Sequence, residues 1–295
     1  MPLPDLTTRL AALPLWSGPL EIEPLPGGLT NRNVLVRSGQ GRFVARAAGD
    51  NAIHGIDRRA EQAATRAAAE AGLGPELVWA EADLMVLRHV EGRTLAATDL
   101  AEAATLRRTV ALLRLAGTAM PRLYRGPVLD RRPLVLLDRY RRMLSERPNR
   151  WRGAVEACRP LLTRLAAGLA AIPPGFAHND IHGGNLIDDG HRLWLVDWEY
   201  AGQGQPMADI ASLANNALLS EEHAGEALAQ WLGHGPDAGE REAFAAMRLA
   251  AALRDLLWGY AQDAFAAPPA EDLADYIAVN EQRVKTAAQR LQPRR

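Results

Sequence analysis

One stretch of this sequence, residues 176–200, decides most of what the chain can fold into. It contains two short apolar runs, 186–187 and 193–196, which are joined by the four polar or small residues 188–191. The joining segment includes an Asp-Gly step, and Asp-Gly between apolar runs is a strong signal for a tight turn between antiparallel strands. The sequence therefore predicts a β-hairpin at this place.

Three oxygen-bearing side chains flank the predicted hairpin. Asp180 and Asn185 come before its first strand, and Asp197 follows its second strand. Because the two outer ends of a hairpin lie side by side, we expect these side chains to form one cluster. Hard cations such as Mg²⁺ prefer oxygen ligands and keep phosphate groups as further ligands. The cluster predicts a magnesium site; the alternative is that these residues only cap their own turns.

The pattern His178-x-Asp180-x-x-x-x-Asn185, with Asp197 after the next strand, resembles the catalytic loop and metal-binding aspartate of kinase-like phosphotransferases. Protein kinases continue with Asp-Phe-Gly, whereas this chain has Asp-Trp-Glu-Tyr-Ala at 197–201. That segment is similar to the small-molecule branch, which includes choline and ethanolamine kinases, thiamine kinase and aminoglycoside phosphotransferases. The resemblance implies that Asp180 is the catalytic base and that Asn185 and Asp197 hold magnesium. It gives His178 a scaffold role.

The composition is that of an ordinary globular protein, 48% hydrophobic and 23% charged. The 34 basic and 35 acidic residues nearly cancel, so we expect neither nucleic acid nor an anionic membrane as a partner. The N-terminus lacks the pattern of a signal peptide, and no run approaches the ~20 apolar residues of a membrane span. We expect a cytoplasmic protein. The single cysteine, Cys158, lies in an apolar-periodic stretch and predicts a buried thiol in a reducing compartment.

Strand patterns dominate the first 90 residues, apart from a leading helix at 5–15 and an alanine-rich helix that begins after Asp57 and ends at Gly72. The strand-like runs are 20–25, 33–37, 42–47, 76–80 and 83–87. From about residue 97, apolar residues recur at helical spacing. This order predicts a two-lobe α+β fold. The resemblance implies a protein-kinase-like arrangement, with a small antiparallel-sheet lobe at 1–90 that binds nucleotide and a mainly helical lobe at 91–295 that holds the catalytic loop and substrate pocket.

A glycine-rich turn follows the first predicted strand. The backbone N–H groups of such a turn can approach a phosphate closely, but Gly-Gly turns between strands are usually only turns, and no Walker-type lysine follows. The segment Gly-Gly-Leu-Thr-Asn looks like the nucleotide loop of choline-kinase-like enzymes. By that resemblance, the nucleotide is bound by Gly27, Gly28, Thr30 and Asn31.

Arg46 lies on the third predicted strand, where the resembling families keep a basic residue, usually lysine, for the ATP phosphates. A guanidinium offers phosphate oxygens a planar fork of donors, so arginine preserves that role. The resemblance also implies a pair between Arg46 and Glu61 of the next helix. It makes 87–92 the hinge, with adenine bonded to backbone groups near Arg88 and Val90. The alternative for Arg46 and Glu61 is a solvated surface position.

The helix predicted over 247–265 carries the best indication of a substrate. Asp255, Trp258 and Gln262 recur at i, i+3 and i+7 on a face separate from its apolar stripe. An aromatic face beside a carboxylate holds an ammonium group well. Resemblance to choline kinases implies acceptor contacts from Glu199, Tyr200, Asp255 and Trp258. The alternative is that Trp258 only packs against the lobe.

Together these patterns predict an ATP- and magnesium-dependent kinase that phosphorylates the hydroxyl of a small cationic amino alcohol, with choline or ethanolamine first. Thiamine kinase is the next alternative, followed by an aminoglycoside phosphotransferase or a catalytically silent nucleotide-binding module. A protein kinase is disfavoured, because the Asp-Phe-Gly and Ala-Pro-Glu sequences are missing. The resemblance implies that Asp209, near the start of a later helix, braces the catalytic loop; the alternative is a first-turn carboxylate that the helix dipole favours. The sequence leaves open GTP in place of ATP, and a homodimer in place of a monomer.

Overall fold

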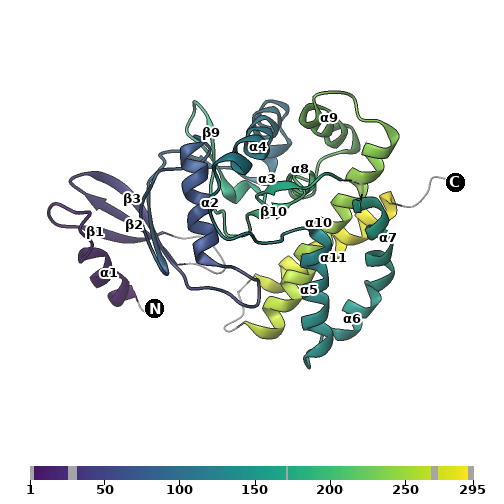
Figure 1. Cartoon of the computed structure of the whole chain (residues 1–295), viewed down its shortest axis with the longest axis horizontal. Helices are drawn as coiled ribbons and strands as arrows, with labels where there is room; N and C mark the ends of the chain where they lie inside the picture. Colours follow the sequence, from purple (N-terminus) through teal and green to yellow (C-terminus); the bar gives the residue numbers. More distant parts are fainter. Residues whose placement is uncertain (1–2, 26–31, 171, 267–271, 292–295) are drawn as a thin grey trace.

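The computed structural model describes residues 3–25, 32–170, 172–266 and 272–291. An antiparallel sheet occupies one end of the molecule and a group of helices the other, and the two termini lie at these opposite ends (Figure 1). We propose the boundary between the two lobes at residues 90–91, just beyond the last strand of the sheet.

The sheet has five strands in the order β1-β2-β3-β5-β4, and every neighbouring pair is antiparallel. Its strands are β1 Glu21–Leu25, β2 Arg32–Ser38, β3 Gly41–Ala47, β4 Leu77–Glu81 and β5 Leu84–Arg88. Side chains alternate between the two faces of a strand, so Val34, Val36 and Phe43 share a small core with Leu6 and Leu10 of the leading helix α1, Leu3–Ala11. The predicted strands are confirmed, and the leading helix is present but ends at Ala11 instead of residue 15.

Helix α2, Arg58–Glu70, crosses between the sheet and the helical lobe. The carboxylate of its predicted N-cap, Asp57, accepts hydrogen bonds from two backbone N–H groups of the first turn. Gly72 follows the helix with φ +70°, a left-handed conformation that glycine adopts without strain. Both predicted ends of the helix are confirmed.

The second lobe consists mainly of helices. They are α3 Ala97–Ala101, α4 Ala103–Leu123, α5 Pro133–Glu146, α6 Arg152–Ala157, α7 Arg159–Ala170, α8 Met207–Asn216, α9 Glu221–Leu232, α10 Ala238–Phe265 and α11 Leu273–Arg290. Cys158, between α6 and α7, is buried as predicted. Among the described residues, no helix is both long enough and apolar enough to span a bilayer.

Helix α10 is the centre of this lobe, because it packs against α5, α7, α8 and α11. Its side chains Leu249, Leu253 and Leu257 are completely buried. The helix is longer than the predicted range of 247–265. It begins after Asp237, because this residue and Glu240 form a reciprocal capping box that sequence periodicity alone does not reveal.

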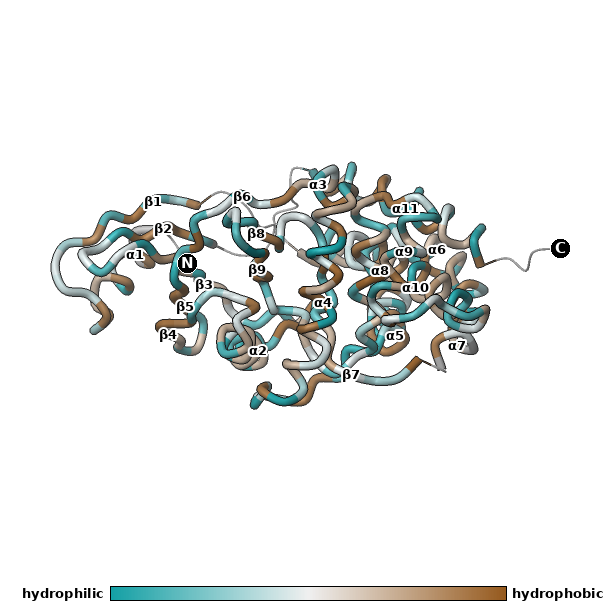
Figure 2. Tube along the Cα trace, turned by 90° about the horizontal axis from the view of Figure 1, so that it is seen from above, coloured by the Kyte–Doolittle hydropathy of each residue, from teal (hydrophilic) through white to brown (hydrophobic). Residues whose placement is uncertain are grey.

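The predicted hairpin is present as β8, Leu186–Asp188, and β9, Leu193–Leu195. The carboxylate of Asp189 closes its turn by accepting hydrogen bonds from the N–H groups of His191 and Arg192. The hairpin lies between the sheet and the helices (Figure 2). Short strands surround it: β6 Arg93–Thr94, which pairs with β8, and the pair β7 Gly175–Ala177 and β10 Gly202–Gly204. The polar residues at the ends of the hairpin therefore face the junction of the lobes.

Candidate active site

A cavity of about 1010 Å³ is lined by side chains of both lobes. The predicted site residues that line it are Arg46, Glu61, Arg88, Val90, Asp180, Asn185, Asp197, Glu199, Tyr200, Asp255 and Trp258. The predicted nucleotide-loop residues Gly27, Gly28, Thr30 and Asn31 lie outside the described residues. The fold thus gathers predicted site residues from widely separated parts of the sequence around one cavity.

The segment before Asp180 has an unusual backbone conformation. Asn179 has φ 65°, a left-handed value that few residues other than glycine adopt. The Asp209 carboxylate, in α8, accepts hydrogen bonds from the backbone N–H groups of His178 and Asn179, at 2.9 and 2.7 Å. The buried His178 ring accepts from the Asp180 N–H at 3.2 Å and lies 3.0 Å from the carbonyl of Val196. The predicted bracing role of Asp209 and scaffold role of His178 are confirmed.

The Asp180 carboxylate lines the cavity and lies among hydrogen-bond donors. Asn185 Nδ2 donates to its Oδ2 at 3.1 Å, and Arg254 Nη2 lies 3.8 Å from its Oδ1. The Nε2 of His182 lies 3.6 Å from Oδ2. Burial by itself would raise the pKa of Asp180, but His182 and Arg254 outweigh this effect and hold the pKa well below its usual range. Asp180 is therefore ionised at neutral pH and can accept a hydrogen bond from a hydroxyl group.

His182 is a residue of this site that our sequence analysis missed. Its Nδ1 accepts a hydrogen bond from the Gly184 N–H at 3.1 Å, which leaves the proton of the neutral ring on Nε2, toward Asp180. Burial lowers the pKa of His182, but the Asp180 carboxylate outweighs burial and raises it above its usual value. Its place two residues after Asp180, within the recognised motif, was the signal that could have revealed it.

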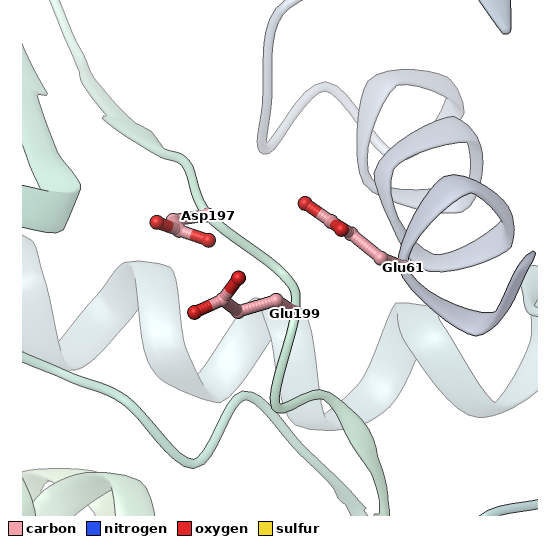
Figure 3. A group of neighbouring side chains, drawn as sticks. All are labelled: Glu61, Asp197 and Glu199. Carbon is pink, nitrogen blue, oxygen red and sulfur yellow. The ribbon is translucent and has the colours of Figure 1, made fainter. Parts of the chain in front are cut away.

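Three carboxylates converge at the part of the cavity where the sequence predicts the nucleotide, here named the nucleotide end: Glu61 from α2, and Asp197 and Glu199 from the segment after β9 (Figure 3). One oxygen of each lies within 4.8 Å of the others. Asp197 has φ 65°, a strained conformation of the kind that clusters at functional sites. Burial and the charge of Asp197 raise the pKa of Glu199 to about 7.

Two arginines partly neutralise these carboxylates. Arg46 Nη1 lies 2.7 Å from Asp197 and 3.1 Å from Glu61, and its Nη2 lies 2.7 Å from Glu199. Arg58 Nη1 lies 2.5 Å from Glu61 and 3.0 Å from Glu199. The predicted Arg46–Glu61 pair is therefore present, but it belongs to a larger buried cluster that joins both lobes. Arg58 was not predicted, because a run of arginines at the start of a helix usually indicates a solvated surface.

The four predicted acceptor residues do not lie together. The Glu199 carboxylate pairs with Arg46 and Arg58 at the nucleotide end. The next residue, Tyr200, accepts a hydrogen bond from the Trp258 indole Nε1 at 2.9 Å. The structure thus brings Tyr200 and Trp258 together, while the ion pairs of Glu199 belong to the carboxylate cluster.

Aromatic rings surround Trp258 of α10 at the other end of the cavity. The His54 ring stacks on the indole with centroids 4.8 Å apart, and the Tyr276 ring of α11 meets it edge-on at 5.3 Å. Tyr276 was missed because α11 lies outside the recognised motifs. His54 was missed because a lone histidine in a loop carries no signal in the sequence. The grouping produces an apolar, electron-rich wall.

Charged groups lie close to this wall. Asp255 Oδ1 accepts hydrogen bonds from Arg254 Nε and Nη2, at 3.0 and 2.5 Å. Burial alone would lower the pKa of Arg254, but the carboxylates of Asp255 and Asp180 outweigh it and raise the pKa further above its usual value. Arg254 thus stands as a permanent cation between the predicted base and the predicted acceptor carboxylate. Its position directly before Asp255 in the sequence was the only signal of this role.

The predicted hinge leaves the sheet at the end of β5. The N–H group of Arg88 donates to the Glu76 carbonyl and that of His89 to the Arg42 carbonyl, at 2.9 and 3.0 Å. A Cβ atom at Gly92 would lie 2.6 Å from the Asp188 carbonyl oxygen, so only glycine lets the chain pass the hairpin here. The backbone donors of Arg88 and His89 are therefore already bonded within the protein.

The sequence profile of the phosphotransferase enzyme family matches residues 21–249. Protein LicA of Haemophilus influenzae is 28% identical over 210 residues, which make up 67% of this chain and only 59% of the length of that protein. A choline/ethanolamine kinase family protein from Mesorhizobium loti has a solved structure with TM-score 0.74 and 26% identity, covering 98% of this chain and 95% of that one.

Two further solved structures confirm the two-lobe kinase-like fold. Choline kinase LicA from Streptococcus pneumoniae gives a TM-score of 0.75 at 19% identity, covering 98% of both chains. A LicA structure in complex with AMP gives 0.73 at 21% identity, covering 98% of this chain and 97% of that one. The family profile spans the sheet, the catalytic segment and the first part of α10, up to residue 249. Because this match takes in well over half of the sequence, the chain belongs to the phosphotransferase enzyme family.

Proposed function

We propose that this protein is an ATP- and magnesium-dependent kinase that phosphorylates the hydroxyl of a small cationic amino alcohol, with choline or ethanolamine as the first candidates. One observation carries the proposal. One cavity holds an ionised Asp180 together with the basic and predicted metal-binding groups of Arg46 and Asp197 and with the aromatic group around Trp258. That arrangement suits transfer of a phosphoryl group from a nucleotide to an alcohol.

The nucleotide end suits an adenine next to the hinge. Val44, Leu87 and Ile187 offer apolar side chains to the cavity there. Since the N–H groups of Arg88 and His89 are already bonded, we assign the backbone contacts of the base to their carbonyls and to Val90. The LicA structure in complex with AMP supports nucleotide binding in this family.

The predicted magnesium ligands fit a hard cation. Asn185 uses its Nδ2 to hold Asp180, which leaves its amide oxygen for the ion. One carboxylate oxygen of Asp197 accepts from Arg46, and the other is available as a ligand. When bound, Mg²⁺ neutralises phosphate charge and orients the phosphates. Oxygen donors alone, without sulfur or imidazole, match this metal.

The acceptor end suits a singly charged cation. Among the cavity-lining residues that we place at this end, three carboxylates face two guanidinium groups, and they are Asp180, Asp255, Asp272, Arg254 and Arg283. With His182 neutral, this leaves one net negative charge, which a monocation neutralises. The indole of Trp258 and the phenol of Tyr200 supply cation–π surfaces beside it. A polycationic aminoglycoside is less well matched by this balance.

Different residues of this chain have different roles in the phosphoryl transfer. Asp180 accepts the hydroxyl proton and aims the oxygen at the γ-phosphorus; the new P–O bond forms as the bond to the β–γ bridging oxygen breaks, and ADP leaves. Arg46 balances the charge that grows on the leaving phosphates. The donors around Asp180 keep it unprotonated between turnovers.

Measuring ADP release by the purified protein with Mg-ATP tests the proposal, using choline, ethanolamine, thiamine and kanamycin in turn. We expect one amino alcohol to stimulate turnover and Asp180→Asn to reduce it by at least about a thousandfold, because base and positioning are lost together. Asp275→Asn, an exposed aspartate of α11, is the matched control and should keep full activity. Turnover with thiamine alone would favour the thiamine kinase alternative. Nucleotide binding without turnover on any alcohol would favour a silent module.

A further inference from the structure

A loop of the N-terminal lobe, residues 51–56 between β3 and α2, has a closed and defined shape. The backbone N–H and carbonyl of Asn51 pair with the carbonyl and N–H of Ile56, at 3.1 and 3.0 Å. The Asn51 side chain accepts hydrogen bonds from the N–H groups of Ile53 and His54, at 3.0 and 3.2 Å. The loop therefore presents His54 from a fixed backbone.

This 51–56 loop is fastened to the helical lobe. Arg131 Nη2 donates to the Gly55 carbonyl at 2.7 Å, and Arg139 of α5 donates to the carbonyl of Ala52. Gly55 has φ +70°, and a Cβ atom there would collide with the Arg139 guanidinium. The loop thus belongs to the first lobe by sequence but to the second by its contacts.

The His54 ring enters the acceptor end of the cavity, where only 1% of the residue is exposed. Its Nε2 lies 2.8 Å from Gln262 Oε1, and its Nδ1 lies 3.0 Å from the Tyr140 hydroxyl. Because an amide oxygen can only accept, Nε2 carries the proton and Nδ1 accepts from the tyrosine. Both ring nitrogens are satisfied by a neutral imidazole, so its orientation is fixed from α5 and α10.

The same ring fixes Trp258. One face of the indole is covered by His54, and Nε1 is held by the Tyr200 hydroxyl. A neutral imidazole supplies a flat surface without a positive charge, whereas an imidazolium would compete with a substrate cation for the electrons of the indole. The ring is therefore suited to hold Trp258 in place while leaving its attraction for a cation intact.

We propose that His54 is a positioning residue of the acceptor site: it acts through Trp258 and brings the N-terminal lobe into the recognition of the cation. The inference rests on the proposed function, since it assumes that a cationic alcohol binds against Trp258. If His54 only stabilised the 51–56 loop, replacing it would lower the stability of the fold. It would then weaken the binding of choline and of Mg-ADP to the same extent.

A double-mutant cycle on choline binding distinguishes these roles. Calorimetric titration measures the choline Kd of the full chain, of His54→Ala, of Trp258→Leu and of the double variant. We expect each single variant to weaken binding on the order of tenfold. We expect the double variant to be no weaker than Trp258→Leu alone, because His54 has nothing left to position. The Kd of Mg-ADP should stay within about twofold throughout.

A second variant in the same loop controls for folding. Ile53→Ala removes a partly buried side chain that packs against the helical core, and it should lower the Tm while leaving the choline Kd unchanged. Independent, additive effects of His54→Ala and Trp258→Leu would overturn the positioning role, as would equal weakening by Ile53→Ala. A wild-type chain that binds neither choline, ethanolamine nor thiamine would overturn the proposed function, and the positioning role with it.

Discussion

Arg46 Nη1 lies 2.7 Å from Asp197 Oδ1, although the two residues are 151 positions apart in the sequence and come from different lobes. The predicted phosphate-binding cation is thus paired with the predicted metal-binding carboxylate. The remaining partners of Arg46, Glu61 and Glu199, keep it buried at this place. In the proposed function, a bound Mg-nucleotide would offer phosphate oxygens to Arg46 and a cation to Asp197, so each residue of the pair would exchange its partner for a ligand.

We first predict the effect of replacing Arg46. Arg46→Ala leaves the buried carboxylates of Glu61 and Glu199 with Arg58 as their neighbouring cation, and removing one partner from a buried ionic cluster costs about 3–5 kcal/mol. Arg46→Lys restores the charge but not the fork that reaches Asp197 and Glu199 together, so it should recover only part of the stability and activity. Urea unfolding and the KM for Mg-ATP check this. Equal unfolding free energies and equal KM values for the two variants would contradict a role for the two donor groups of the guanidinium.

The features that follow from local patterns could be predicted from the sequence. Asp57 caps α2 through its own next three residues, and the β8–β9 hairpin follows from its Asp-Gly turn. The catalytic positions and the Arg46–Glu61 pair required the family resemblance as well. His54 and Arg58 could not be predicted, because their roles depend on partners 208 and 141 residues away. Such contacts exist only once the lobes have packed together.

A second prediction concerns Glu199 and pH. Its pKa in the folded protein is about 7 against an ordinary value of 4.5, so the folded state binds this proton more tightly than the unfolded state. The group therefore adds stability at acidic pH that is lost as the pH rises from about 4.5 through 7. The loss amounts to about 3 kcal/mol. Glu199→Gln should remove this dependence, which urea unfolding at pH 5 and pH 8 measures against the wild type.

The third prediction concerns His54, whose contribution to stability changes with pH in the opposite direction to that of Glu199. Burial lowers the pKa of His54 from 6.5 to about 4, so the unfolded state binds this proton more tightly. Stability should therefore fall as the pH drops from about 6.5 toward 4, by about 3 kcal/mol for this group. A His54→Gln variant should be less sensitive to acid over that interval. If its unfolding free energy follows the wild-type pH profile, His54 is charged in the folded protein and the assigned tautomer is wrong.

The last prediction concerns Asp209, whose hydrogen bonds hold the backbone just before the proposed base, Asp180. Both oxygens of Asp209 accept backbone hydrogen bonds, and these hold Asn179 in its left-handed conformation, which costs about 1 kcal/mol when unsupported.

Asp209→Asn turns one acceptor into a donor that faces an N–H group, so we expect a loss of about 2–4 kcal/mol in unfolding free energy. Because Asp180 directly follows Asn179, its carboxylate should shift, and kcat should fall at least about tenfold while the Kd of Mg-ADP changes little. Asn216→Ala is a useful comparison, since it removes a single hydrogen bond to the Ile181 carbonyl on the other side of Asp180. It should cost only about 1 kcal/mol. An Asp209→Asn variant with normal kcat would show that the position of Asp180 does not depend on this brace.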